Sequence, residues 1–250
     1  MQMKKDIHLT AQDLLGMVQL RPEDVGKYAI VPGPKDRLEV LIKKLENPVR
    51  NFSFMEYAMY TGTLDGIKVT AINGGRFSPD TAITTEILCG AGIKNIIRIG
   101  SCGALREDIK VGDLVLAIAA VRADGVTPNY VTADFVTVAD KQVNQVMMEL
   151  IKTTGIKVHT GQVWTTDALL RETREKVNDA VGKGAIAVDM VTSAFLTICQ
   201  INKVKATAIL SVSDNIITGE LGFMNPLFYR AESAMIDLAL NTVRKLEGRA

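Results

Sequence analysis

Strand-length apolar runs alternate along this chain with longer segments of helical period. The strongest run covers residues 204–212, where β-branched and small apolar side chains follow one another almost without a break. Such a run is typical of a strand that is buried on both faces, because helices then cover both sides of its sheet. Apolar residues recur at helical spacing in the intervening segments 37–45, 140–153 and 227–246. This alternation predicts an α/β fold, with one domain over residues 1–250 and a central mixed sheet flanked by helices on both sides.

A charged residue interrupts another apolar run, at residues 96–99, just before a glycine-rich bend at residues 100–103. The charge belongs to Arg98, and a buried guanidinium needs an anion because an unpaired charge in a low dielectric is costly. No acidic residue follows in the sequence until Glu107. The anion is therefore either a distant carboxylate of the same chain or a ligand. Among ligands, phosphate best suits an arginine fork, the Ser101 hydroxyl and loop amides.

Three predicted strand ends carry glycine or charged residues, namely residues 32–37, 99–103 and 211–215. Ligands of open α/β sheets bind beyond the carboxyl ends of the strands, so these ends are candidates for one common site. Each also has a simpler interpretation. Pro32 followed by glycine is a common turn, and Asp214 could cap a helix.

Composition excludes several classes of function. A net charge of +1 and an aromatic content of 5% argue against nucleic-acid binding. Three widely separated cysteines and two histidines favour free thiols in a reducing compartment and no metal site. No segment of the sequence has the length and apolarity of a membrane span or of a leader. The sequence therefore predicts a cytoplasmic protein with no metal, nucleic-acid or membrane partner.

Taken in order, these motifs resemble those of the nucleoside phosphorylase family, which contains uridine phosphorylases and hexameric purine nucleoside phosphorylases. The resemblance covers nearly the whole chain, and residues 98–104 are its most specific part. It implies a pentosyltransferase of nucleoside salvage, which reversibly cleaves the N-glycosidic bond with phosphate to give free base and pentose 1-phosphate. It also implies nucleoside and phosphate as partners, no cofactor, and a homo-oligomer built from dimers, with hexamers as one form. The other matching segments are residues 8–10, 30–37, 112–113, 188–190 and 211–214.

The resemblance also assigns roles to individual residues. It implies that Asp214 and Arg98 are catalytic, with Asp214 as the acid that protonates the leaving base. A carboxylic acid with a raised pKa can protonate purine N7, so a purine is slightly favoured. Without the resemblance, Met190 would be interpreted as helix core and His8 as a surface residue. Phosphate binding is implied for Gly33, Arg37, Arg98 and Ser101, and sugar or base binding for Asp189, Met190, Val191, Ser213 and for His8, which would reach a neighbouring subunit.

Three positions depart from the family pattern. Val191 stands where a carboxylate normally binds the ribose hydroxyls, and a bound ribose would leave hydroxyls unpaired at a cost of roughly 1–3 kcal/mol. Met55 occupies the place of an arginine that the partner subunit normally lends. The usual glycine-rich loop is replaced by residues 73–80. We hypothesise that Arg76 of this loop restores the cation at the phosphate, and that Asp80 takes over a sugar contact.

The identity of the base stays open. The uridine branch normally reads uracil with a glutamine and an arginine, but residues 167–174 contain arginines and no glutamine. Asp214 favours a purine, although the second arginine of the purine branch has only Arg230 as a nearby candidate, and Leu9 with Thr10 resembles the uridine branch. The alternatives are a uridine phosphorylase, a nucleoside hydrolase of the same fold, and a nucleoside-binding relative without activity. The sequence does not decide between ribose and 2′-deoxyribose.

Overall fold

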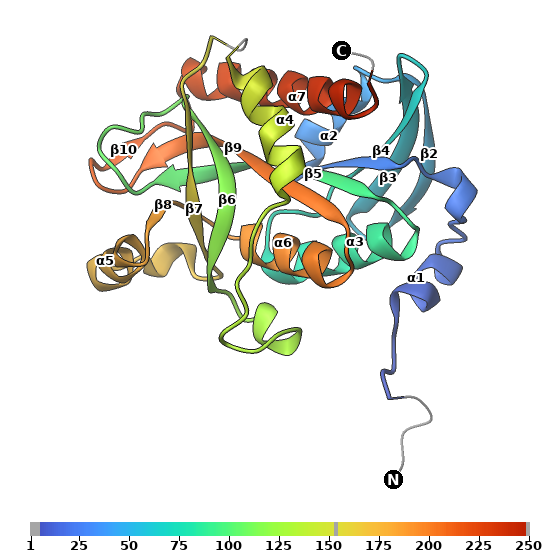
Figure 1. Cartoon of the computed structure of the whole chain (residues 1–250), viewed down its shortest axis with the longest axis horizontal. Coiled ribbons are helices and arrows are strands. Elements are labelled where there is room, and N and C mark those ends of the chain that lie inside the picture. Colours follow the sequence, from blue (N-terminus) through green and yellow to red (C-terminus); the bar gives the residue numbers. More distant parts are fainter. Residues whose placement is uncertain (1–5, 153–154, 249–250) are drawn as a thin grey trace.

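A mixed sheet of ten strands forms the centre of the molecule, with helices against both of its faces (Figure 1). The computed structural model describes residues 6–152 and 155–248 of the chain. The predicted α/β fold with a central mixed sheet is confirmed. The predicted domain limits, residues 1 and 250, and the predicted helix end at Thr153 lie outside the described residues.

The strands pair in the order β10-β9-β6-β7-β8-β5-β1-β4-β3-β2, and β9 also pairs with β5. This additional pairing closes β5, β8, β7, β6 and β9 into a ring, and the remaining strands extend the sheet from β5 and β9. The bounds are β1 Tyr28–Pro32, β2 Glu46–Phe54, β3 Tyr57–Leu64, β4 Ile67–Ile72, β5 Asn95–Ala104, β6 Leu114–Ala123, β7 Val158–Thr166, β8 Ala185–Asp189, β9 Lys205–Asn215 and β10 Glu220–Leu221.

Strand β5 changes its partner halfway along one edge. Its first half, up to Ile99, pairs in parallel with β1, and Gly103 and Ala104 pair with β8 in the antiparallel sense. The other edge of β5 is paired with β9 along its whole length. Gly100 and Ser101 therefore lie between the part of β5 that pairs with β1 and the part that pairs with β8. Ligands of α/β sheets bind at such points, where neighbouring strands diverge.

Helices on the two faces bury separate parts of the core. Ile97 and Ile99 of β5 belong to the cluster under α2, α4 and α7, whereas Ile96 belongs to the cluster under α1, α3 and α6. Because side chains alternate along a strand, Arg98 starts from the same face as Ile96. The bounds are α1 Ala11–Met17, α2 Lys35–Ile42, α3 Ser78–Gly90, α4 Lys141–Ile151, α5 Arg174–Gly182, α6 Thr192–Ile201 and α7 Pro226–Leu246, with the 3₁₀ turns η1 Pro22–Asp24, η2 Thr127–Asn129 and η3 Leu169–Arg171.

Two hairpins precede the site, and only one of them was predictable. An Asp-Gly pair between two strand-length runs predicts a hairpin at Asp65 and Gly66, and both residues adopt positive φ, 50° and 76°, as the turn between β3 and β4 requires. Strand β2 was not predicted, because it is an edge strand whose side chains are mostly exposed and lack an apolar pattern. Met55 lies in the turn after β2 and is 80% exposed. No helix within the described residues is long and apolar enough to cross a bilayer.

Candidate functional site

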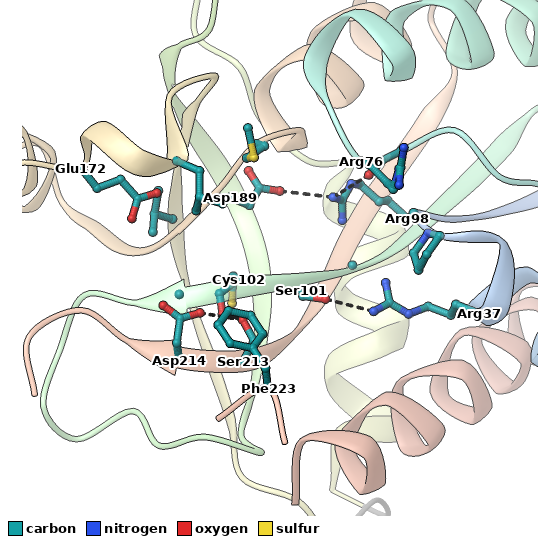
Figure 2. A pocket seen from close by; sticks show the side chains of 18 residues that line it. Arg37, Arg76, Arg98, Ser101, Cys102, Glu172, Asp189, Ser213, Asp214 and Phe223 are labelled. Atoms are coloured by element: carbon teal, nitrogen blue, oxygen red, sulfur yellow. Dashed lines mark hydrogen bonds and ion pairs between the residues drawn. The ribbon is translucent and has the colours of Figure 1, made fainter. Parts of the chain in front are cut away.

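A cavity of about 230 Å³ opens at the carboxyl ends of β1, β5, β8 and β9, beside the partner switch of β5. Its two ends carry opposite charges. Figure 2 shows the arginines on one side and the carboxyl groups of Glu172 and Asp214 on the other. The lining residues that bear on the chemistry are Gly33, Arg37, Arg76, Arg98, Gly100, Ser101, Glu172, Asp189, Met190, Ser213, Asp214 and Phe223.

Arg98 is buried to 3% exposure, and its hydrogen-bonding capacity is largely unused. Its Nη2 donates to the carbonyl oxygen of Gly75 at 3.2 Å and lies 3.5 Å from Oδ2 of Asp189. Nε and Nη1 are buried and have no hydrogen-bond partner among the described residues. Burial lowers the pKa of this guanidinium, and the negative charge of Asp189 acts in the opposite direction. A buried cation with orphaned N–H groups is a strong indication of a missing anion.

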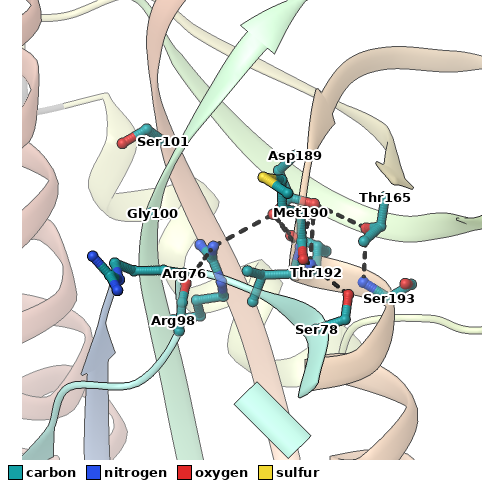
Figure 3. Close-up of polar contacts among 12 residues, drawn as sticks. Arg76, Ser78, Arg98, Gly100, Ser101, Thr165, Asp189, Met190, Thr192 and Ser193 are labelled. Carbon is teal, nitrogen blue, oxygen red and sulfur yellow. Dashed lines mark hydrogen bonds and ion pairs between the residues drawn. The ribbon is translucent and has the colours of Figure 1, made fainter. Parts of the chain in front are cut away.

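The internal carboxylate that the sequence left as an alternative partner for Arg98 is Asp189, but this carboxylate is already saturated. It accepts hydrogen bonds from Thr165 Oγ1 at 2.8 Å and from Thr192 Oγ1 at 2.6 Å (Figure 3). The backbone amides of Val191 and Thr192 donate to it as well, each at 3.1 Å. Asp189 therefore fixes the start of α6 and holds one edge of the Arg98 guanidinium, without reaching its Nε or Nη1.

Arg37 lies in the first turn of α2, directly after the loop that contains Gly33. Its Nη1 donates to the carbonyl oxygen of Ile99 at 3.2 Å, and its Nη2 donates to Ser101 Oγ at 2.9 Å. It also forms an ion pair with Glu232 of α7, while its Nε has no hydrogen-bond partner among the described residues. Because the Ser101 hydroxyl accepts from Arg37, its own proton is left to donate to a ligand.

Glycine is required where the arginines and the two loops come together. A Cβ at residue 100 would lie 1.6 Å from Arg98 Nη1, so the guanidinium folds directly over Gly100. A Cβ at residue 33 would lie 3.2 Å from the carbonyl oxygen of Gly75, which keeps the two loops in contact. Gly74 has φ +114°, a conformation that disfavours every residue with a Cβ.

Arg76 lies between this cavity and a second hollow of about 290 Å³, and it lines both. Its side chain is 53% exposed, and its Nη2 is 3.9 Å from Glu56 Oε2. The guanidinium carbon is 5.2 Å from the centre of the Phe77 ring. Asp80 lines only the second hollow of these two. Burial and the hydrogen bond with Asp80 raise the pKa of Tyr57.

Two carboxyl groups form the opposite end of the cavity. Asp214 of β9 accepts a hydrogen bond from Ser213 Oγ at 2.7 Å. Burial raises the pKa of Asp214, and the Ser213 hydrogen bond partly offsets the rise. Glu172 follows η3, and burial together with the charge of Asp214 raises its pKa to about 7. A raised pKa lets a carboxyl group keep its proton to higher pH, which suits general acid catalysis.

The remaining predicted site residues fall into two groups. Met190 lines the cavity, and its carbonyl oxygen accepts a hydrogen bond from Ser78 Oγ at 2.9 Å. Val191 is 1% exposed and packs in the core under α6, so it does not line the cavity. His8 is exposed in the stretch before α1 and does not line the cavity. Arg230 is exposed on α7 and does not line the cavity either.

Sequence reasoning missed two carboxylates of the site. Glu172 lies in the segment where a glutamine of the uridine branch would be expected, and the only available signal was its spacing of three residues from Leu169. Glu232 pairs with Arg37 across 195 positions of sequence, and no local pattern could have indicated that contact.

The chain is similar in sequence and in fold to known proteins. A family model described as the phosphorylase superfamily matches residues 27–240. A uridine phosphorylase of Thermococcus kodakarensis is 29% identical over 219 residues, which are 82% of this chain and 79% of that protein. A guanosine phosphorylase of Halorubrum lacusprofundi is 26% identical over 196 residues, 78% of this chain and 81% of that protein. A solved purine nucleoside phosphorylase of Toxoplasma gondii, in complex with immucillin-H, has a TM-score of 0.85 at 25% identity and covers 100% of both chains.

Proposed function

The chain belongs to the phosphorylase superfamily, as an enzyme of its nucleoside phosphorylase family, and from that premise we propose that it cleaves purine nucleosides with inorganic phosphate. The supporting observation is the pair of orphaned nitrogens on Arg98, Nε and Nη1, of which Nη1 lies directly against Gly100, the neighbour of Ser101. A buried site of this kind is matched by an oxyanion with several acceptor oxygens. Nucleoside and phosphate are the substrates of the family.

Phosphate would bind at the arginine end. Arg98 offers Nε and Nη1, Arg37 offers Nε, and Ser101 offers its hydroxyl proton. The backbone amide of Gly33 can approach closely because the residue has no Cβ. Glu232 and Asp189 hold the two guanidinium groups in place from behind, so the donors are oriented before phosphate arrives. Preoriented donors are worth more than flexible ones, since they need no reorganisation during the reaction.

Cleavage would proceed between the two ends. As the bond between sugar C1′ and the base breaks, the base takes the bonding electrons and C1′ gains positive charge. A phosphate oxygen forms the new bond to C1′, and its negative charge stabilises that carbon beforehand. A proton from Asp214 to purine N7 would neutralise the leaving base. The raised pKa of Asp214 supports this role, because the acid form persists to higher pH.

Arg76 would supply the third cation of the phosphate site, in place of an arginine from a partner subunit. Its stem contacts the Gly33 loop, since a Cβ at residue 33 would lie 3.5 Å from Arg76 Cγ. Its weak ion pair with Glu56, at 3.9 Å, leaves the guanidinium able to turn towards phosphate. Asp80 would contact the sugar from the second hollow.

The sugar would rest on Met190, and His8 would reach it from a neighbouring subunit. His8 is exposed and does not line the cavity of its own chain, which supports a contact in trans and with it a homo-oligomer built from dimers. Val191 leaves the ribose hydroxyls without the carboxylate that the family normally provides, so we propose that 2′-deoxyribonucleosides are accepted as well as ribonucleosides.

Product analysis with and without phosphate tests this function. Inosine, guanosine, adenosine, uridine and their 2′-deoxy forms are incubated with the protein, and base and sugar products are measured. We expect base release that requires phosphate, yields pentose 1-phosphate and is fastest with a purine. Base release at equal rates without phosphate would establish a hydrolase, and preference for uridine would establish the uridine branch. Binding without turnover of any nucleoside would establish a non-catalytic relative.

A further inference from the structure

Three buried polar side chains behind the cavity form a hydrogen-bonded chain that ends on Asp189. They are Asp124, directly after β6, Ser193 in the first turn of α6, and Thr165 of β7, and none of them lines the cavity. Ser193 Oγ donates to Asp124, and the amide of Ser193 donates to Thr165 Oγ1 at 2.9 Å. Thr165 Oγ1 in turn donates to Asp189 Oδ1 at 2.8 Å (Figure 3). The chain therefore connects the end of β6 with the carboxylate beside Arg98.

The Thr165 hydroxyl can point in only one direction. It carries a single proton, and the carboxylate of Asp189 can only accept, so the proton lies towards Asp189. Its lone pair accepts from Ser193, whose amide lies in the first turn of α6 and has no partner within the helix. Rotation of the side chain would take these partners from a buried amide and a buried carboxylate oxygen, which is unfavourable. Thr165 is therefore held in one orientation.

Asp124 fixes the far end of the chain. Its Oδ1 accepts from the amides of Val126 and Thr127, at 2.9 and 2.7 Å, and its Oδ2 accepts from Thr127 Oγ1 at 2.9 Å and from Ser193 Oγ. The residue is 6% exposed, so water is largely excluded. Hydrogen bonds to a charged acceptor are stronger than those between neutral groups. The start of α6, and with it the Ser193 amide, is thus tied to the loop after β6.

This arrangement draws Asp189 away from Arg98. Strand β8, which ends at Asp189, lies between β7 and β5 in the sheet, so Thr165 and Arg98 come from strands on opposite sides of it (Figure 3). Thr165 and Asp189 are also paired in register across β7 and β8. The distance of 3.5 Å between Asp189 Oδ2 and Arg98 Nη2 exceeds the roughly 2.7–2.9 Å of a hydrogen bond between charged groups. The two charges therefore attract each other without forming a closed pair.

We propose that Thr165 is a positioning residue of the phosphate site, which holds Asp189 back from Arg98 and so keeps Arg98 available to an anion. This inference rests on the proposed function, in which phosphate is that anion. Without the Thr165 hydroxyl, the carboxylate would close on Arg98 and form a direct hydrogen-bonded ion pair. Phosphate would then meet a cation that an internal carboxylate has already neutralised, and it would bind more weakly.

Thr165→Val tests this role, because valine keeps the shape of the side chain and removes the hydroxyl. We expect KM for phosphate to rise about tenfold, the effect of one hydrogen bond, while kcat at saturating phosphate stays within about twofold of wild type. Thr165→Ser keeps the hydroxyl and should return KM to the wild-type value. Thr197→Val is the matched control, since Thr197 is also a fully buried threonine but its hydroxyl pairs with Thr137. Equal changes in both valine variants, or no rescue by serine, would overturn the proposal.

A second substitution shows whether Thr165 acts through Asp189. In an Asp189→Asn background, Thr165→Val should leave KM for phosphate unchanged, because no carboxylate remains to close on Arg98. A further rise of about tenfold in that background would contradict the proposed route. Ser193→Ala keeps the Thr165 hydroxyl and loosens only the link to Asp124, so we expect a smaller rise in KM, of about twofold to threefold. A larger effect of Ser193→Ala than of Thr165→Val would contradict the order of the chain.

A crystal structure of Thr165→Val without phosphate separates this inference from the proposed function. We expect the distance between Asp189 Oδ2 and Arg98 Nη2 to shorten to about 2.8 Å. A distance that stays at 3.5 Å would overturn the inference even in an active phosphorylase. Base release that needs no phosphate would overturn the proposed function, and the shortened distance would still support the restraint on Asp189.

Discussion

The two ends of the cavity differ in how the fold holds them. Arg98 and Arg37 are 3% and 7% exposed, and they come from a central strand and from the first turn of a helix. Glu172 is half-buried at the end of a three-residue turn whose neighbouring Leu170 is 90% exposed. Sites on regular elements are held more rigidly than sites on loops. The comparison indicates that the sheet and the start of α2 hold the arginines firmly, whereas a surface turn holds Glu172 less rigidly.

Burial shifts the pKa values of charged groups in opposite directions at the two ends. Burial lowers the pKa of Arg98 at one end and raises the pKa of Asp214 at the other. A bound anion would stabilise the buried Arg98 cation. A bound base would offer hydrogen-bond partners to the buried Asp214 carboxyl group. A nucleoside and a phosphate together therefore complement the cavity better than either does alone.

Removing the acid at the carboxyl end should have the largest effect. Asp214→Asn is isosteric and cannot give up a proton, so kcat should fall roughly 10³-fold, within the range for general acid catalysis. Phosphate affinity should stay within about twofold of wild type if the two ends act separately. Steady-state kinetics with phosphate titrations measure both quantities. A large loss of phosphate affinity would show that the ends are not independent.

Crowding the arginine end should have the next largest effect. A Cβ in Gly100→Ala would lie 1.6 Å from Arg98 Nη1 and would displace the guanidinium. We expect kcat/KM to fall about 10²-fold, the scale of a small misplacement of a binding group. Gly182→Ala is the matched control, because nothing lies within 4 Å of its added Cβ. Equal activities of the two variants would contradict the proposed position of Arg98.

Substituting Arg76 tests whether this exposed arginine contributes to the phosphate site. Arg76→Gln should raise KM for phosphate about tenfold, as expected for one charge-assisted hydrogen bond in a partly exposed site. KM for the nucleoside should stay within about twofold of wild type, because the base would bind at the other end of the cavity. Arg171→Gln, an exposed arginine outside the cavity lining, is the control. An unchanged KM for phosphate would exclude Arg76 from the site.

The smallest expected effect is a pH-dependent change in melting temperature when Glu172 is substituted. The pKa of Glu172 is raised from 4.5 to about 7 in the folded protein, so its ionisation opposes folding increasingly as pH rises from 4.5 to 7. Glu172→Gln should therefore melt about 2–4 °C above wild type at pH 8, the shift that ~1 kcal/mol gives in a chain of this size. The two proteins should melt together at pH 4. A constant difference across this pH range would contradict the burial of the carboxyl group.

The sequence was informative where a residue broke a local pattern. Arg98 was detectable because a charge in an apolar strand is costly, and that cost alone implies an anionic partner, either a carboxylate or a ligand. The sheet and the β3–β4 hairpin followed from periodicity and from Asp65-Gly66. Strand β2 escaped detection because an exposed edge strand needs no apolar alternation.

Contacts between distant segments could not be predicted in the same way. Glu232 meets Arg37 only because α7 lies over α2 and β5, and Asp189 meets Arg98 through the switch of β5 from β1 to β8. Its place after Met190 predicted that Val191 faces the sugar. Val191 instead immediately precedes α6 and its side chain is buried in the core. Each of these placements depends on packing between elements and not on local sequence.

The most direct measurement is a crystal structure of the protein with inorganic phosphate and a purine base. We expect phosphate within hydrogen-bond distance of Arg98 Nη1 and the Ser101 hydroxyl, and the base between Asp214 and Glu172. An empty arginine end at saturating phosphate, with both guanidinium groups held only by Asp189 and Glu232, would contradict the assignment of opposite ends to anion and base.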